Sequence, residues 1–165
     1  MYYDILERRE EFRAAYDVVI LFDVLEHIED ANAFLSAVLD PLRPGGWLLI
    51  NVPAQAWLFS HYDRMVGHVR RYQRRTLANE FRGLPVTIED LRYWGVSLVP
   101  VAALRKLALA IMRPASAGAT VDLGFKPPHP AIQGLFLNLM RAENAAPIAY
   151  PVGSSLLLAA RKHER

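Results

Sequence analysis

Three side chains that can bind a divalent cation or move a proton lie close together near the start of the sequence. Asp23, Glu26 and His27 belong to the segment DVLEHIED. If a helix begins near Val24, these side chains lie about one turn apart and can face a common point. Two carboxylates and an imidazole suit hard or borderline divalent cations. A second interpretation stays open, and we favour it: Glu26 and Asp30 stabilise a helix N-terminus, while His27 packs against the following loop.

A second group of polar side chains lies in HYDRMVGHVRRY, which runs from His61 to Tyr72. His61 and His68 can each act as a general base, because an unperturbed imidazole titrates near neutral pH. Four arginines at the end of this segment and just after it can hold a phosphate or a carboxylate. These arginines are Arg70, Arg71, Arg74 and Arg75. A solvated arginine face that pairs with Asp63 and Glu80 is the simpler interpretation, and both stay open.

Apolar runs and turn residues predict the elements that must position these groups. Residues 17–22 (DVVILF) and 47–53 (WLLINVP) are continuous apolar runs, typical of strands buried on both faces of a parallel sheet. Between them, residues 31–39 show helical spacing with Asp30 as the N-cap. Residues 40–46 (DPLRPGG) predict a stop and a turn. This order is a βαβ unit, whose crossover we expect to be right-handed.

The second half of the chain predicts two strands and two amphipathic helices. The strands are expected at 86–94 and 154–162, and the helices at 98–112 and 131–144. Residues 113–130, rich in Gly, Pro and Ala, predict a loop. No apolar run reaches the length of a membrane span. Peripheral contact of the two helices with a membrane surface is an alternative to packing within the protein.

Composition limits the class of protein. A chain of 165 residues with 53% hydrophobic and 22% charged residues predicts one globular domain over residues 1–165. The pI is near 9.0, but a net charge of only +2 does not favour nucleic acid as a partner. The sequence has no cysteine and no secretory signal at its N-terminus, which together predict a cytoplasmic location.

Several segments together resemble class I S-adenosylmethionine-dependent methyltransferases. They are YYDIL, YDVVILFDVLEHIED, LRPGGWLLINVP, GHVRRYQRRTL and GSSLLLAARK. The resemblance implies a Rossmann-like α/β fold with a mostly parallel sheet, an antiparallel C-terminal strand and the strand order 3-2-1-4-5-7-6. The run 17–22 would be the fourth strand of that order, and 47–53 the fifth. The resemblance also implies S-adenosylmethionine as the cofactor of the complete fold and a small molecule as the methyl acceptor.

The resemblance assigns cofactor contacts to five residues. Asp4 would accept a hydrogen bond from the adenine amino group, and Ile5 would lie beside the ring. Leu21, Phe22 and Asp23 would line the cofactor pocket where the fourth strand ends. This placement agrees with the general position of ligands on open α/β sheets, beyond the carboxyl ends of the strands.

The resemblance also bears on catalysis and metal binding. The loop after the fifth strand faces the methyl group in this family, which makes His61 or His68 the expected general base. Ubiquinone-pathway O-methyltransferases and small-RNA 2′-O-methyltransferases carry a metal on a similar E-x-x-E-H segment. That likeness implies a metal site at Asp23, Glu26 and His27, with His68 as the further ligand. We favour the interpretation without a metal.

The sequence departs from the family pattern on its N-terminal side. The Gly-rich turn after the first strand, and the acidic residue that ends the second, have no counterpart here. We therefore expect a truncated methyltransferase domain with weak cofactor affinity. Its strand at 17–22 would be a sheet edge, covered by residues 2–6 or by a second copy in a homodimer. The alternative is a non-catalytic methyltransferase-like half-domain that acts as a structural or oligomerisation module.

Overall fold

The computed structural model describes residues 10–112, 130–146 and 148–164. The strand predicted at 2–6 and most of the loop predicted at 113–130 lie outside these ranges. Within them, every other predicted helix and strand is present, with boundaries that differ by a few residues.

A four-stranded sheet in the order β1-β2-β4-β3 forms the centre of the molecule. β1 (Tyr16–Phe22) pairs in parallel with β2 (Leu42–Pro53). β4 (Ser155–Lys162) lies between β2 and β3 (Val86–Trp94), antiparallel to both. Three strands therefore share one direction and the C-terminal strand opposes them. This confirms the predicted α/β class and reproduces the 4-5-7-6 portion of the expected order.

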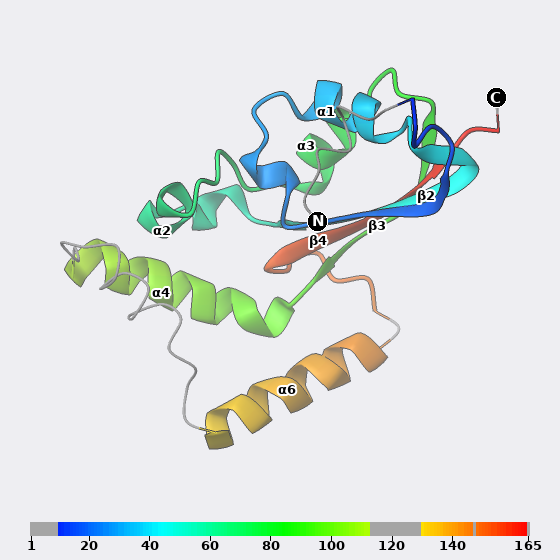
Figure 1. Cartoon of the computed structure of the whole chain (residues 1–165). Helices are drawn as coiled ribbons and strands as arrows, with labels where there is room; N and C mark the ends of the chain where they lie inside the picture. The colour runs from blue at the N-terminus through cyan, green and yellow to red at the C-terminus, as the bar shows by residue number, and fades with distance from the viewer. Residues whose placement is uncertain (1–9, 113–129, 147, 165) are drawn as a thin grey trace.

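Helices lie on both sides of the sheet. Figure 1 shows α1 and α3 on one side, and α4 and α6 on the other. The α-helices are α1 (Ala31–Val38), α2 (His61–Met65), α3 (Arg74–Asn79), α4 (Val99–Met112) and α6 (Pro130–Ala145). Short 3-10 helices are η1 (Leu25–His27), η2 (Ala56–Leu58) and η3 (Val96–Leu98).

The core lies on the side of α1 and α3. Alternate side chains of a strand point to opposite faces, so Leu48 and Ile50 of β2 share a face with Leu156 and Leu158 of β4 across the sheet. All four are fully buried, and Leu35 of α1 is buried in the same cluster. Each such side chain contributes roughly 1.5–3 kcal/mol of transfer free energy. The βα unit is therefore held against the C-terminal strand pair by one continuous core.

β1 is the outer strand of the described sheet, as predicted. The face of β1 that carries Val18, Ile20 and Phe22 is open to solvent, because these side chains are 43%, 56% and 52% exposed. Apolar edge strands of this kind pair readily with other chains. Coverage of this edge by residues 2–6, or by a second copy, stays a prediction.

The turn predicted at 40–46 is wrong in part, because β2 already begins at Leu42. Leu42 pairs with Tyr16 of β1, and a shift of register follows before regular pairing resumes. Gly46 allows the two backbones to approach, since a Cβ there would lie 2.9 Å from the carbonyl oxygen of Asp17. The Pro-Gly-Gly segment therefore forms an irregular strand entry instead of a free turn.

The expected helix start near Val24 is also replaced by a different local structure. Asp23 has a left-handed backbone, with φ of 54°, which ends the strand abruptly. One 3-10 turn follows, and α1 begins only after Asp30. Asp30 is the N-cap, as predicted, and its carboxylate accepts a 3.0 Å hydrogen bond from the backbone N–H of Ala33 in the first turn of α1.

A long insertion separates the paired strands β3 and β4. Residues 95–154 carry α4 and α6, yet Trp94 and Ser155 at its two ends are paired in the sheet. The backbone N–H of Ser154 donates to the carbonyl of Gly95 at 3.2 Å, which closes the base of the insertion.

α4 has an unusual distribution of polarity. Leu104, Leu107 and Ile111 are 66%, 56% and 71% exposed. Arg105 and Lys106 instead face the protein. Arg105 lies over the ring of Tyr62, and Lys106 donates a hydrogen bond to the backbone carbonyl of Trp57 in η2. Three apolar side chains of α4 therefore face solvent while two charged ones face the protein, although Leu109 of the same helix is buried. No helix among the described residues is long and apolar enough to cross a membrane.

Candidate functional site

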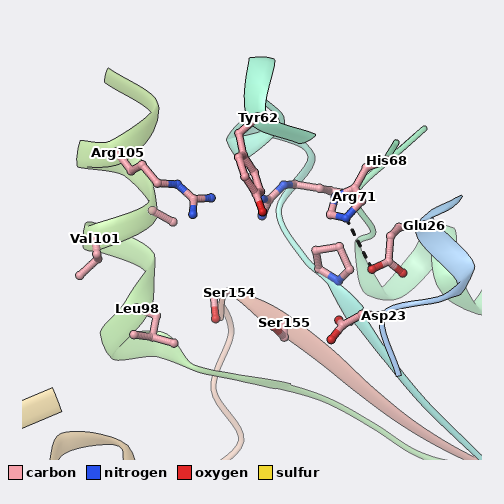
Figure 2. A pocket seen from close by; sticks show the side chains of 12 residues that line it. Asp23, Glu26, Tyr62, His68, Arg71, Leu98, Val101, Arg105, Ser154 and Ser155 are labelled. Atoms are coloured by element: carbon pink, nitrogen blue, oxygen red, sulfur yellow. Dashed lines mark ion pairs between the residues drawn. The ribbon is translucent and has the colours of Figure 1, made fainter. Parts of the chain in front are cut away.

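A pocket of about 470 Å³ opens where β1 and β2 end (Figure 2). Asp23 follows β1, Pro53 ends β2, and Ser155 begins the antiparallel β4 at the same edge. This edge is where open α/β sheets bind ligands. The remaining lining residues are Glu26, Tyr62, His68, Arg71, Leu98, Val101, Ala102, Arg105 and Ser154.

Glu26 is a buried carboxylate beside the pocket. Its side chain is 1% exposed, and neither carboxylate oxygen has a hydrogen-bond partner among the described residues. Burial raises the pKa of Glu26 above its ordinary value, and the negative charge of Asp23 raises it further. A buried, unsatisfied acid is costly to the fold, so its presence indicates a role that packing does not explain.

Asp63 is fully buried and ionised. It sits in the first turn of α2, where its Oδ2 accepts hydrogen bonds from the N–H and the hydroxyl of Ser60 at 2.8 and 2.9 Å. Its Oδ1 accepts from Nε of Arg71 at 2.7 Å. Burial alone would raise the pKa of Asp63. The hydrogen bond and positive charge of Arg71, together with the two hydrogen bonds from Ser60, instead hold this pKa below its usual range.

Asp63 also fixes the orientation of His68. Nδ1 of His68 lies 3.1 Å from Oδ1 of Asp63. An ionised carboxylate only accepts hydrogen bonds, so Nδ1 donates and Nε2 keeps its lone pair. Nε2 is 3.9 Å from Oε1 of Glu26, the contact drawn in Figure 2. Burial lowers the pKa of His68, although the hydrogen bond and charge of Asp63 act in the opposite direction. The lowered pKa keeps the imidazole neutral near pH 7.

His27 completes a group of metal-binding type. Its Nδ1 donates to the carbonyl of Gly67 at 3.1 Å, and its ring lies 4.8 Å from that of His68, edge to face. One donor atom each from Glu26, His27 and His68 lie within 4.8 Å of one another. One carboxylate and two imidazoles fit a divalent transition metal. Asp23, predicted with this set, is not part of the group. The contact of His27 with Gly67 is also the packing expected from the interpretation without a metal.

Asp23 is held by a chain of hydrogen bonds that crosses the strand ends. Nε1 of Trp94 donates to Oδ1 of Asn51 at 2.9 Å, and Nδ2 of Asn51 donates to Oδ1 of Asp23 at 3.1 Å. Three strands thus fix one carboxylate at the rim of the pocket. This role of Asn51 depends on the register between strands, which a linear sequence pattern does not reveal.

The predicted cofactor contacts are distributed unevenly. Asp23 lines the pocket, whereas Leu21 is buried in the core and Phe22 is exposed on the open face of the sheet. Asp4 and Ile5 lie outside the described residues. The assignment of these five residues to the cofactor stays a prediction.

The two candidate bases differ in position. His68 lines the pocket, while His61 is exposed at the start of α2 and is not among the lining residues. The simpler pairing expected for the arginines is present: Arg70 contacts Glu80 at 3.3 Å, and Arg71 contacts Asp63.

Two lining residues, Tyr62 and Arg105, were not predicted from the sequence. The Arg105 guanidinium lies 4.9 Å from the centre of the Tyr62 ring. For Arg105, the available signal in the sequence was an arginine that interrupts an apolar helix. The orienting role of Asp63 had a signal too, because Ser60 and Asp63 have the spacing of a capping box.

Comparison with known proteins agrees with this architecture. Residues 4–86 match the family described as "Methyltransferase domain". A ubiquinone biosynthesis O-methyltransferase of Shewanella halifaxensis (strain HAW-EB4) is 31% identical over 84 residues, which cover 50% of this chain and 30% of that protein. One from Shewanella sp. (strain ANA-3) is 40% identical over 43 residues, or 26% of this chain and 18% of that protein.

A solved structure extends the likeness beyond the family match. The SAM dependent methyltransferase from Archaeoglobus fulgidus superposes with a TM-score of 0.50 at 13% identity, over 98% of this chain and 66% of that one. The chain thus spans less than two thirds of these proteins. The family match covers half of the sequence and the fold likeness nearly all of it, so this chain belongs to the methyltransferase-domain family, among the class I S-adenosylmethionine-dependent methyltransferases.

Proposed function

We propose that this chain carries the acceptor-binding and proton-transfer side of an S-adenosylmethionine-dependent methyltransferase that modifies a hydroxyl group of a small molecule. One observation carries the proposal: Nε2 of a neutral His68 and the buried Glu26 face one pocket at the strand ends. The likeness to two ubiquinone biosynthesis O-methyltransferases supports oxygen as the methylated atom.

S-adenosylmethionine, when bound, supplies a methyl group on a positively charged sulfur, so the acceptor needs alignment and the loss of one proton. Nε2 of His68 would take that proton from the acceptor hydroxyl. Asp63 holds the imidazole through Nδ1 and stabilises the imidazolium that results. Glu26, 3.9 Å from Nε2, adds a second negative charge for the same purpose.

The described residues supply one side of a cofactor site. Asp23, fixed by Asn51 at the end of β1, supports cofactor binding at this edge. Asp4 and Ile5 are proposed as the adenine contacts. Because residues 1–165 contain no Gly-rich turn, we propose that these residues by themselves bind S-adenosylmethionine weakly. Calorimetric titration with S-adenosylmethionine tests this, and micromolar binding would contradict it.

The same groups offer a second use. Glu26, His27 and His68 would hold a divalent cation such as Zn²⁺ or Mn²⁺, which would polarise a bound oxygen. A cation on Nε2 of His68 would remove the lone pair that the base needs, so the two uses exclude each other. Metal analysis of the purified chain distinguishes them, and we favour the form without a metal.

Transfer of a tritiated methyl group from S-adenosylmethionine to a panel of hydroxylated small molecules tests the proposed function. His68→Gln removes the base and should lower the rate by about 10²-fold or more. His61→Gln is the matched control, because His61 does not line the pocket, and its rate should stay unchanged. Equal rates for His68→Gln and the native chain would overturn the assignment of the base.

The alternative is a non-catalytic half-domain, and the exposed apolar strand β1 favours it. Val18, Ile20 and Phe22 would pair with a second copy or with another chain along the free edge. A native chain that transfers no methyl group and sediments as a dimer would support this alternative. A monomer at micromolar concentration would count against it.

A second surface suggests where the protein works. The solvent-facing side of α4, with Leu104, Leu107 and Ile111, and the exposed leucines of α6 support contact with a membrane surface. We propose peripheral contact of this kind from the cytoplasmic side.

A further inference from the structure

A second cavity, of about 460 Å³, lies at β3 and shares no lining residue with the pocket at the strand ends. β3 is the outer strand of the described sheet at the end opposite β1. Arg74, the first residue of α3, lines the cavity together with residues 90–93 of β3 and residues that follow α6. Figure 1 shows α3 and α6 on opposite sides of the sheet. The cavity therefore follows the outer edge of β3.

An irregularity in β3 brings side chains of both its faces to this cavity. The pairing of β3 with β4 shifts in register between Ile88 and Asp90, and such a shift changes the alternation of side chains. Beyond it, Leu91 and Tyr93 pack against the core, whereas Asp90 and Arg92 belong to the other face. Arg92 and Asp90 form an ion pair there. One edge thus combines a buried aromatic ring with charged groups.

The guanidinium of Arg74 is only partly satisfied by the protein itself. It lies 4.8 Å from the centre of the Tyr93 ring, and its Nη2 donates to the carbonyl of Tyr150 at 3.0 Å. Its Nε is buried and has no hydrogen-bond partner among the described residues. A buried N–H without a partner is rare and costs stability, so packing alone does not explain the position of this side chain.

The cavity also has an excess of positive charge. Arg92 is balanced by Asp90, whereas Arg74 makes no ion pair within the described part of the chain. Arg70 and Arg71, from the same segment, each have an acidic partner. An anion in the cavity would balance Arg74. Because Asp90 lines the same cavity, an anion with one negative charge fits better than one with two.

We infer that this cavity binds a small organic carboxylate and that Arg74 is its anchor. A planar guanidinium binds a carboxylate through charge-assisted hydrogen bonds, and its contact with the Tyr93 ring keeps the group oriented. Leu91 and Ile148 line the cavity and contact the apolar part of the ligand. The cavity is separate from the pocket that contains His68, so this inference does not depend on the proposed function.

Titrations followed by NMR test the site without any need for turnover. The probes are pentanoate, pentyl phosphate and pentan-1-ol, which share an apolar chain and differ in the end group. Pentyl phosphate carries roughly two negative charges at pH 7.5. We expect pentanoate to bind at millimolar concentration, at least tenfold more tightly than the alcohol and more tightly than the phosphate. Nuclear Overhauser contacts from its methyl group should reach Leu91 and Ile148.

Variants identify the anchor. Arg74→Gln should weaken pentanoate binding about tenfold or more. Arg74→Lys keeps the charge without the planar fork and should give an intermediate affinity. Arg75→Gln is the matched control, because Arg75 is exposed, is the next residue of α3 and does not line the cavity. Ile148→Asp adds a negative charge at a lining position that is 61% exposed, and should also weaken binding without disturbing the core.

Several results would overturn the site. Pentanoate that fails to bind at millimolar concentration, or binds no better than pentan-1-ol, excludes an anion site. Tighter binding of pentyl phosphate contradicts the carboxylate as the ligand class. Equal losses for Arg74→Gln and Arg75→Gln, or full affinity in Ile148→Asp, exclude Arg74 and this cavity. Contacts of pentanoate with Leu98 and Val101 would instead place it in the pocket at the strand ends.

Discussion

Replacement of Glu26 by methionine should make the protein more stable. The carboxylate is 1% exposed, and its two oxygens have no hydrogen-bond partner among the described residues. An unsatisfied buried polar group costs about 1–3 kcal/mol, and a charged one more. Methionine has a similar length and adapts its shape to the space. A gain of about 1–3 kcal/mol corresponds to a rise in Tm of roughly 2–12 °C for a chain of this size.

Thermal unfolding followed by circular dichroism at pH 7.5 with EDTA measures this gain. Glu29→Met is the matched control, because Glu29 is exposed in the same segment, and its stability should change by less than about 0.5 kcal/mol. An equal or lower Tm for Glu26→Met than for the native chain would refute the reasoning. Added Zn²⁺ gives a second comparison: if a cation binds here, it should raise the Tm of the native chain and leave that of Glu26→Met unchanged.

Three further outcomes follow from contacts described above. Asn51→Leu removes the bond that holds Asp23 and should cost about 1–3 kcal/mol in urea unfolding; a stability equal to the native chain would show that the bond does not matter. Glu143 accepts hydrogen bonds from η3; burial alone would raise its pKa, but these bonds lower it below the ordinary value. Its stabilisation is therefore complete above the ordinary glutamate pKa and is lost as the pH falls through the lowered one. Glu143→Gln should be less stable than the native chain at pH 7, and the difference should vanish in acid; a constant difference would contradict this. In liposome flotation, the native chain should rise with the lipid fraction, whereas the double variant Leu104→Asp/Leu107→Asp should remain in the dense fraction. Absence of the native chain from the lipid fraction would exclude membrane contact.

The sheet could be predicted because β1, β2 and β4 are rich in apolar residues, β3 alternates in polarity, and polar or turn residues mark the strand ends. The run 86–94 is the observed strand, and Asp30 caps α1 as its type and position indicate. The entry to β2 could not be predicted in the same way. Gly45 and Gly46 favour a turn locally, but pairing with β1 draws that segment into the sheet with an irregular register.

The site could be predicted only in part. His68, Glu26 and Asp23 were candidates from residue type, and all three line the pocket. Their states could not be predicted. The burial of Glu26 depends on tertiary packing, and the tautomer of His68 depends on Asp63, which lies five residues earlier on α2. Arg105 comes from an insertion whose position over the strand ends is set by tertiary packing, which local patterns do not encode.

The closed base of the insertion 95–154 makes the protein modular. Trp94 and Ser155 are paired, and Gly153 lies so close to the Trp94 backbone that a Cβ would be 2.3 Å from its carbonyl oxygen. The sheet therefore fixes where the insertion leaves and returns, whatever its length or sequence, and the entropy of closing it grows only slowly with length. The strand-end acids and His68 lie outside this segment, whereas Arg105 lies within it. Under the proposed function, exchange of the insertion would change one wall of the pocket while His68 and the strand-end acids stay in place.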